Sequence, residues 1–276
     1  MADRYAAAWH LADDFPVESF GVAVVDSDGV HTHGSTARVQ RIASVSKPLA
    51  AWAALIAVEE GSVSLDDPVG QPGCTLRHLL AHAGGYPFFG AEPVGKPGVK
   101  RIYSNTGFDM IATHVESRTD MPFGDYMAEA VFAPLGMANT ALRGSCAKDV
   151  FSSVSDLVRF VQELRRPALL ARETYVEAVT PAFPGIDGML PGLGHMDPCP
   201  WGLGLEIRGH KSPHWTSPSN SSATFGHFGG IGTFLWVDPV ADVACVMLAE
   251  REFDEWGADH WPGFSTAVLN ARSAGN

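Results

Sequence analysis

The sequence predicts one α+β domain, in which an antiparallel sheet is assembled from both ends of the chain and packs on a helical lobe. Three observations predict this fold. β-rich segments occupy residues 21–25 and 30–34 and return only after residue 200. The chain between them is mainly helical in character, and a last helix-like segment follows the final strands. One sheet with one helical lobe is the simplest way to join elements in this order.

The chain length agrees with a single domain. Its 276 residues exceed one minimal core and fall short of two full-sized domains. Within a domain spanning residues 1–276, we assign residues 1–43 and 200–276 to the sheet lobe and residues 44–199 to the mainly helical lobe. We expect substrate to bind at the seam between the lobes, because pockets commonly form where packed units meet.

Each element has its own signal. Residues 26–29 supply the turn residues of a first hairpin, and an Ala- and Leu-rich run from Lys47 to Glu60 ends at Gly61, as a buried helix would. Further helices are predicted at 76–83, 106–118, 122–132, 156–165 and 262–272, further strands at 201–207, 232–237 and 242–249, and a Pro- and Gly-rich loop at 87–99.

Composition excludes several function classes. Nineteen Lys and Arg against 31 Asp and Glu give a net charge of −12, and the densest basic spot is only Arg165-Arg166, so we expect no nucleic-acid partner. The most apolar window, residues 49–58, is too short to span a bilayer, so we expect no membrane partner. The N-terminus lacks the pattern of a secretion signal and the four cysteines are scattered, which favours a cytoplasmic protein with reduced, buried thiols.

The strongest chemical signal is Ser44-Val45-Ser46-Lys47 at the start of the apolar helix. Residues three apart share a helix face, so the Ser44 hydroxyl can meet the Lys47 amine. A serine becomes a nucleophile when a nearby base takes its proton, and apolar neighbours can lower the pKa of a lysine until it acts as that base. The alternative is that Ser44 only caps the helix.

Two further segments carry polar or flexible groups suited to a site. In Tyr103-Ser104-Asn105 the phenol can relay a proton and the amide can orient a substrate carbonyl, although this segment can also be a tyrosine beside a helix cap. In residues 227–230 (HFGG) the glycines let a substrate approach the backbone, although an ordinary bulge or turn has the same appearance.

Together these segments resemble the serine β-lactamase and penicillin-recognising enzyme superfamily, in its class C β-lactamase, D,D-peptidase and esterase branch. The resemblance covers about residues 21–250 and includes residues 41–48 (RIASVSKP), 79–85 (LLAHAGG), 103–107 (YSNTG), 133–137 (APLGM), 153–160 and 226–239. The order and spacing of the motifs are more specific than any one motif. The fold of that superfamily, a helical lobe against an antiparallel sheet, agrees with the prediction above.

The resemblance implies a role for each matching residue. Ser44 would be the acylated nucleophile, and Lys47 its proton acceptor or the group that keeps Tyr103 deprotonated. Tyr103 would be the general base in acylation and donate to the leaving group. Substrate would be bound by Asn105, His227, Phe228 and Gly229, and the oxyanion by the backbone N–H groups of Ser44 and Gly230. No cofactor or metal is implied.

The third motif departs from the Lys-Thr-Gly of the superfamily. Phe228 cannot hydrogen-bond a substrate carboxylate as threonine can, and His227 holds a carboxylate less firmly than lysine. We therefore expect an esterase or small amidase acting on a small ester, amide or D-peptide. The alternatives are a D,D-peptidase, D-aminopeptidase or weak β-lactamase, and a non-catalytic ligand-binding module. The oligomeric state is left open.

Three other patterns are weaker. His78 and His82 have the i, i+4 spacing of metal ligands, but the Glu that a zinc protease needs is replaced by Leu79, which favours packing. Residues 90–96 match a phosphate-binding loop, but Pro97 replaces its Ser or Thr. Trp215, in a Ser- and Pro-rich loop before the third motif, is our candidate for a pocket lid.

Overall fold

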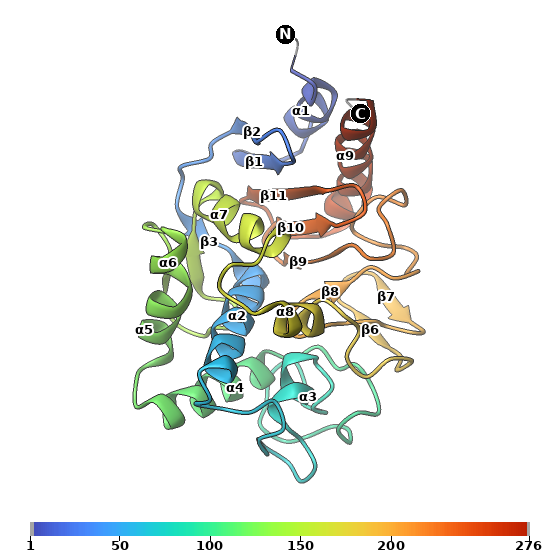
Figure 1. Cartoon of the computed structure of the whole chain (residues 1–276). Coiled ribbons are helices and arrows are strands. Elements are labelled where there is room, and N and C mark those ends of the chain that lie inside the picture. Colours follow the sequence, from blue (N-terminus) through green and yellow to red (C-terminus); the bar gives the residue numbers. More distant parts are fainter. Residues whose placement is uncertain (1–2, 275–276) are drawn as a thin grey trace.

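The computed structural model describes residues 3–274, and its centre is a six-stranded antiparallel sheet built from both ends of the chain (Figure 1). The strand order is β2-β1-β11-β10-β9-β8. These strands are β1 (Phe20–Val25), β2 (Val30–Gly34), β8 (Glu206–Ile207), β9 (Phe225–Gly229), β10 (Thr233–Asp238) and β11 (Val243–Ala249). Strand β1 pairs with β11 from Phe20↔Ala249 to Val25↔Ala244, so the predicted fold class is confirmed.

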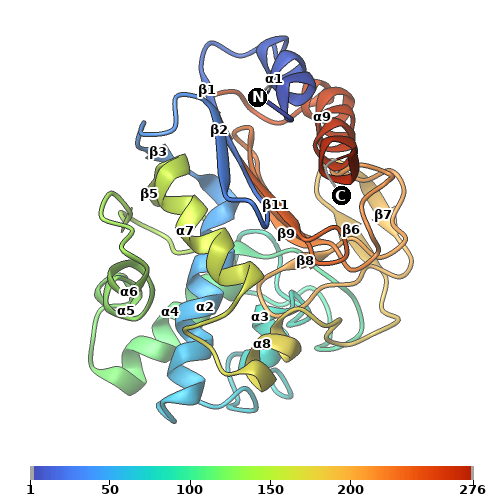
Figure 2. The same ribbon diagram turned by 45° about the horizontal axis from the view of Figure 1, so that its top comes forward.

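The two faces of the sheet are covered by different layers because strand side chains alternate between faces. Alternate residues such as Val22, Phe234 and Met247 pack against α1 (Ala6–Asp13) and α9 (Glu255–Ala274), which contact each other. The intervening residues face α7 (Val154–Arg165) and the helical lobe. Figure 2 shows α1 and α9 on one side of the sheet and α7 and α2 on the other.

Helix α2 (Ser46–Glu59) forms the axis of the helical lobe. Around it lie α3 (Leu76–Leu80), α4 (Asn105–Thr119), α5 (Phe123–Met127), the π-helical turn η2 (Ala128–Phe132), α6 (Ala133–Leu135) and α8 (Arg172–Ala178). Two small sheets complete the fold, with order β3-β5-β4 (Gln40–Arg41, Val150–Ser152, Ala141–Leu142) and β6-β7 (Gly188–Leu190, Gly194–Met196). Eleven of the 14 residues of α2 are buried, so this helix is fixed on all sides.

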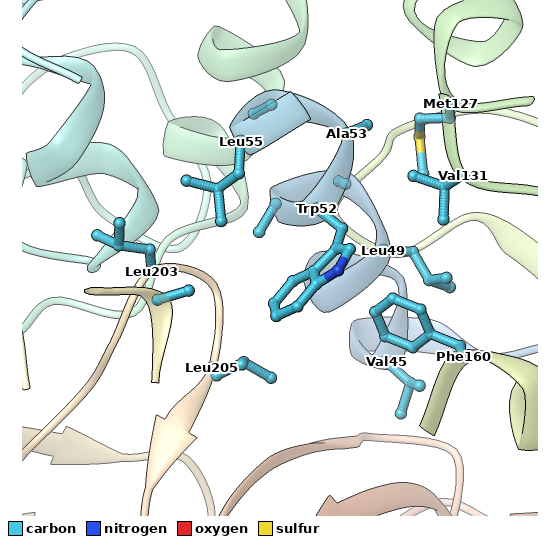
Figure 3. Close-up of a cluster of buried hydrophobic side chains, with 14 of the residues drawn as sticks. Val45, Leu49, Trp52, Ala53, Leu55, Met127, Val131, Phe160, Leu203 and Leu205 are labelled. Atoms are coloured by element: carbon cyan, nitrogen blue, oxygen red, sulfur yellow. The ribbon is translucent and has the colours of Figure 1, made fainter. Parts of the chain in front are cut away.

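Trp52 anchors α2 in the core of the helical lobe (Figure 3). Its indole is fully buried beside Phe160 of α7, at 5.8 Å between ring centroids, and Leu203 and Leu205 approach from the loop before β8. The indole N–H donates to the buried Glu163 carboxylate over 3.2 Å. Because Trp52 lies one and a half turns beyond Lys47, this packing fixes the helix that carries the lysine.

Several element boundaries differ from the sequence prediction. The strand expected at 201–207 is reduced to Glu206–Ile207, because Gly204 adopts φ +83° and approaches Ala51 so closely that a Cβ would lie 2.1 Å from it. The final helix begins at Glu255, and Pro262 lies in its interior rather than at its start. The segment predicted as one helix at 122–132 is interrupted by the π-helical turn, and α1 and α8 were not predicted.

The thiols of Cys74, Cys146, Cys199 and Cys245 are free and buried, as the sequence predicted. None of the helices in residues 3–274 is long and apolar enough to cross a membrane.

Candidate active site

Ser44 lies in a 3-10 turn (η1, Ala43–Val45) that leads directly into α2. Ala43, the residue before it, has φ +47°, a left-handed conformation that costs a non-glycine residue of order 1–3 kcal/mol. The buried Ser46 hydroxyl holds this turn by donating to the Ala43 carbonyl over 2.6 Å and accepting from the Val150 N–H. The turn leaves Ser44 partly exposed while the residues on either side of it are buried.

Lys47, the second residue of α2, is fully buried, and its Nζ faces three acceptors. It lies 2.6 Å from Asn105 Oδ1, 2.9 Å from the Ala147 carbonyl and 3.4 Å from Ser44 Oγ. No ion pair joins it to a carboxylate within the described chain, and burial lowers the pKa of Lys47 to about 7. A neutral amine can give its two N–H bonds to Asn105 and Ala147, which leaves its lone pair facing Ser44.

Tyr103, Ser104 and Asn105 occupy the entry to α4. The Ser104 side chain caps this helix by accepting from the Gly107 N–H over 2.9 Å, so Asn105 projects from the first helical position toward Lys47. The Tyr103 ring lies beneath the Lys47 amine, at 4.6 Å from Nζ to the ring centroid. Burial raises the pKa of the Tyr103 phenol above its usual range, although the Ser44 side chain opposes this shift.

Strand β9 carries the third group of predicted residues. His227 Nδ1 lies 2.6 Å from the Phe228 carbonyl, which can only accept, so Nδ1 carries the proton and the unprotonated Nε2 faces the Tyr103 hydroxyl at 3.4 Å. Burial and the nearby Lys47 lower the pKa of His227 to about 3. His227 is therefore a neutral acceptor at neutral pH.

Glycine at position 229 lets β9 approach the serine turn. A Cβ there would lie 2.8 Å from the Ile42 carbonyl oxygen and 3.1 Å from the Ala43 Cβ. At Gly230, the next residue, a Cβ would meet nothing within 4 Å. The first glycine is thus required by packing, whereas the second faces open space.

A pocket of about 230 Å³ lies between these elements. It is lined by Ser44, Phe88, Tyr103, Pro191, Gly192, Trp201, Glu206, His227, Phe228, Gly230 and Phe253. Among the described residues that line it there is no lysine or arginine, and most of the wall is aromatic. Its volume is below the range of about 300–1,000 Å³ that is common for ligand pockets, so it suits a small group.

Glu206 is the one carboxylate among the described lining residues, and it is held by partners behind the pocket. It forms a buried ion pair with Lys211, and it accepts from Trp215 Nε1 over 3.1 Å and contacts His214 Nε2 at 3.1 Å. Burial alone raises its pKa, but Lys211 and His214 together lower the pKa of Glu206 to about 2. This carboxylate therefore stays charged and fully partnered.

The structure brings the sequence-predicted residues together, some in the pocket wall and some behind it. Ser44, Tyr103, His227, Phe228 and Gly230 line the pocket, whereas Lys47, Asn105 and Gly229 lie directly behind them. Trp215 is not a lid: it is 1% exposed and packs against Phe228 and Phe234 in the core. The Ser- and Pro-rich loop around Trp215 suggested an exposed side chain, but the indole N–H donates to the buried Glu206 carboxylate.

Sequence reasoning missed several lining residues, chiefly Phe88, Glu206 and Phe253. The signal for Phe88 was its place in a pair of aromatic residues, Phe88-Phe89, within the loop at 87–99, and 47% of its surface is exposed. No local motif marks Phe253, whose backbone N–H donates to the Gly230 carbonyl. The rings of His78 and His82 pack on different partners, Phe183 and Tyr103, and each Nδ1 accepts a backbone N–H, from Thr75 and Ser104 respectively.

A model of the beta-lactamase family matches residues 12–264 of this chain. The chain belongs to the beta-lactamase family. The structure is similar to that of a beta-lactamase from Mycobacterium bovis, with 48% sequence identity, a TM-score of 0.95 and coverage of 96% of this chain and 99% of that one. The sequence is 24% identical to that of a beta-lactamase from Pseudomonas fluorescens, over 85% of each chain.

A more partial likeness joins this chain to penicillin-binding protein 4* of Bacillus subtilis. The two are 30% identical over 132 residues, which cover 36% of this chain and 29% of that protein. The fold and the likenesses together make this chain a member of a family of serine hydrolases.

Proposed function

We propose that this protein is a serine hydrolase that forms an acyl-enzyme at Ser44 and acts on small neutral esters or amides. The observation that carries the proposal is the buried Lys47 beside the Ser44 hydroxyl, where no carboxylate among the described residues pairs with it. In acylation, a bond forms between Ser44 Oγ and the substrate carbonyl carbon, the hydroxyl proton passes to a base, and the ester or amide bond breaks. Water then cleaves the acyl-enzyme and releases the acid.

Lys47 is the better of the two candidate bases. Its pKa of about 7 gives a large neutral fraction near neutral pH, with the lone pair toward Ser44. Tyr103 has a raised pKa, so its phenol is protonated and suited to donate to the leaving group. We therefore assign proton acceptance to Lys47 and proton donation to Tyr103, and we interpret Asn105 as the residue that holds the Lys47 amine in place.

The oxyanion of the tetrahedral intermediate is assigned to the backbone N–H groups of Ser44 and Gly230. Both residues line the pocket, and the close packing at Gly229 brings β9 toward the serine turn. Fixed N–H donors at such a position typically contribute about 2.7–4 kcal/mol to catalysis per donor.

The charge of the pocket supports a neutral substrate. A substrate carboxylate would meet no lysine or arginine among the described lining residues, a neutral His227 and the negative Glu206. The aromatic wall instead favours an apolar acyl group, and the volume favours a short one. These features weigh against efficient hydrolysis of penicillins or of peptides that end in a free carboxylate.

The first test is labelling by a fluorophosphonate, followed by intact mass and peptide mapping. We expect one adduct, on Ser44, in the wild-type protein and none at that residue in Ser44→Ala, which loses only a hydroxyl. A folded wild-type protein without an adduct would contradict the proposal and favour a ligand-binding module on the same fold.

The second test compares substrates. We expect p-nitrophenyl acetate and butyrate to be hydrolysed faster than p-nitrophenyl octanoate, and all of them faster than the cephalosporin nitrocefin. The double variant His227→Lys/Phe228→Thr restores the motif that binds carboxylates and should raise the rate of acylation by penicillin. Faster turnover of nitrocefin or of a D-alanyl-D-alanine peptide than of any ester would overturn the neutral substrate class.

A further inference from the structure

His82 holds the chain on both sides of Tyr103. Its backbone carbonyl accepts the Ile102 N–H over 2.8 Å, and its ring Nδ1 accepts the Ser104 N–H over 3.1 Å. One residue thus accepts the backbone N–H groups of the residues on both sides of the tyrosine. Its own ring packs against the Tyr103 ring, at 4.5 Å between centroids.

The backbone of His82 is strained in a way that this arrangement explains. Its φ is +54°, in the left-handed region, where residues other than glycine are uncommon. It stands just after α3, and the reversed backbone turns carbonyl and ring toward the same segment. Strain of this kind persists where the surrounding contacts over-determine it, and it gathers at functional sites.

The ring of His82 is neutral, in one tautomer. Nδ1 accepts from a backbone N–H, so the ring proton is on Nε2. Burial, with the charge of Lys47 nearby, lowers the pKa of His82 well below its usual value. Nε2 is buried without a hydrogen-bond partner among the described residues, and the ring is surrounded by those of Tyr103, Phe108 and Trp201.

We propose that His82 is a positioning residue for Tyr103, fixing the phenol against Ser44 through the hydrogen bond from the Ser104 N–H to Nδ1 and through ring contact. His82 does not line the pocket and is not assigned a proton-transfer step. The inference rests on the role proposed above for Tyr103. It adds the residue that holds the Tyr103 phenol in position relative to Ser44.

Two variants separate the acceptor from the ring. His82→Asn and His82→Ala both remove the ring, but only asparagine keeps an acceptor near the Nδ1 position and tolerates positive φ. For ester hydrolysis we expect His82→Ala to lower kcat by about 10- to 100-fold with KM nearly unchanged, because a small displacement of a catalytic group acts on the reaction step. His82→Asn should recover most of that loss. Equal kcat in the two variants would overturn the proposal.

His78 provides a matched control from the same segment. Its Nδ1 also accepts a backbone N–H, that of Thr75, but its ring stacks on Phe183, away from the pocket. His78→Ala should lower the melting temperature and leave kcat at the wild-type value. A loss of kcat in His78→Ala as large as that in His82→Ala would mean that both act through general destabilisation.

A double-mutant cycle tests whether His82 acts through Tyr103. In the Tyr103→Phe background, His82→Ala should change the rate of Ser44 labelling by less than about twofold, because the effects of substituting two residues that act as a unit are not additive. The same fold-loss in both backgrounds would show a structural role only.

A spectroscopic measurement keeps this inference separate from the proposed hydrolase activity. With ¹³C-labelled tyrosine, and Tyr103 assigned by its loss in Tyr103→Phe, the Tyr103 ring resonance is compared in His82→Ala and His82→Asn, because both variants lack the ring that contacts Tyr103 and differ in the acceptor. The resonance should differ between these two variants and stay near its wild-type position in His78→Ala. If no serine of the protein is labelled but the two His82 variants differ in this resonance, the proposed function fails and the positioning stands. The same Tyr103 resonance in His82→Ala and His82→Asn overturns the positioning, whatever the activity.

Discussion

Two lysines are buried among residues 3–274, and their surroundings are opposite. Lys47, 0% exposed, faces an amide oxygen, a carbonyl and a hydroxyl, whereas Lys211, 4% exposed, forms an ion pair with the equally buried Glu206. A buried lysine without a carboxylate gives up its proton easily, which makes it a base. A buried lysine with one completes a structural ion pair. Burial alone therefore does not mark the reactive residue; the missing counter-charge does.

The largest contrast is expected in reactivity. Lys47→Met should slow fluorophosphonate labelling of Ser44 by about 10²–10⁴-fold, because the general base is lost. Lys211→Met, measured at a temperature at which both variants are folded, should leave the labelling rate in the wild-type range. If Lys211→Met slowed labelling as much as Lys47→Met, the division into a base and a structural ion pair would be wrong.

The next effect is on stability. Glu206→Gln keeps the shape of the side chain but leaves the Lys211 ammonium buried without a counter-charge, which typically costs about 3–5 kcal/mol. Thermal unfolding should show a melting temperature lower by roughly 10 °C for a chain of this size. Adding Lys211→Met to Glu206→Gln should recover much of the loss, and a double variant less stable than the single one would contradict the account.

Asn105→Asp gives Lys47 the partner that Lys211 already has. The amide oxygen lies 2.6 Å from Lys47 Nζ, so the new carboxylate should raise the pKa of Lys47 by about 1–3 units. In the wild type, kcat/KM should rise with pH through about 7 as Lys47 loses its proton. In Asn105→Asp that midpoint should move to higher pH. The exposed Asn139→Asp adds the same charge elsewhere and should leave the midpoint in place.

The smallest expected effect is a dependence of stability on pH. The pKa of Lys47 falls from 10.5 to about 7 on folding, so between these values the unfolded chain binds more protons than the folded protein. Burial of Lys47 therefore costs most below pH 7, and the cost fades as pH rises toward 10.5. The melting temperature of Lys47→Met relative to wild type should be higher at pH 7 than at pH 9.5, whereas Lys96→Met, at an exposed lysine, serves as the control for lost charge. A difference of the opposite sign would show that Lys47 is buried in its charged form.

The sequence predicted the lysine that lacks a counter-charge but missed the paired one. Ser44 and Lys47 are three residues apart on one chain segment, so local spacing shows that they can meet. The pair of Glu206 with Lys211 depends on the turn that follows β8. It also depends on the close packing of Gly204 on Ala51, which shortened the predicted strand.

The fold class was predictable for a similar reason. β-rich runs at both chain ends and a helical middle leave few arrangements. What the sequence could not indicate is which distant side chains close the pocket, since Phe88, Glu206 and Phe253 come from three separate loops and strands. The buried role of Trp215 was also hidden, because its Ser- and Pro-rich surroundings are typical of surface loops.

The pairing of β1 with β11 has a consequence for how the protein is made. A ribosome delivers β1 almost at once, yet its partner strand is synthesised only near the end of translation. Until then the edge of β1 that β11 will cover stays unpaired, and no strand joins β8, β9 and β10 to β1. Contacts between such distant segments form slowly, so the nascent chain should acquire a reactive Ser44 late. Truncated nascent chains that end before β11 should therefore bind a fluorophosphonate poorly even though the whole serine turn and α2 have been synthesised.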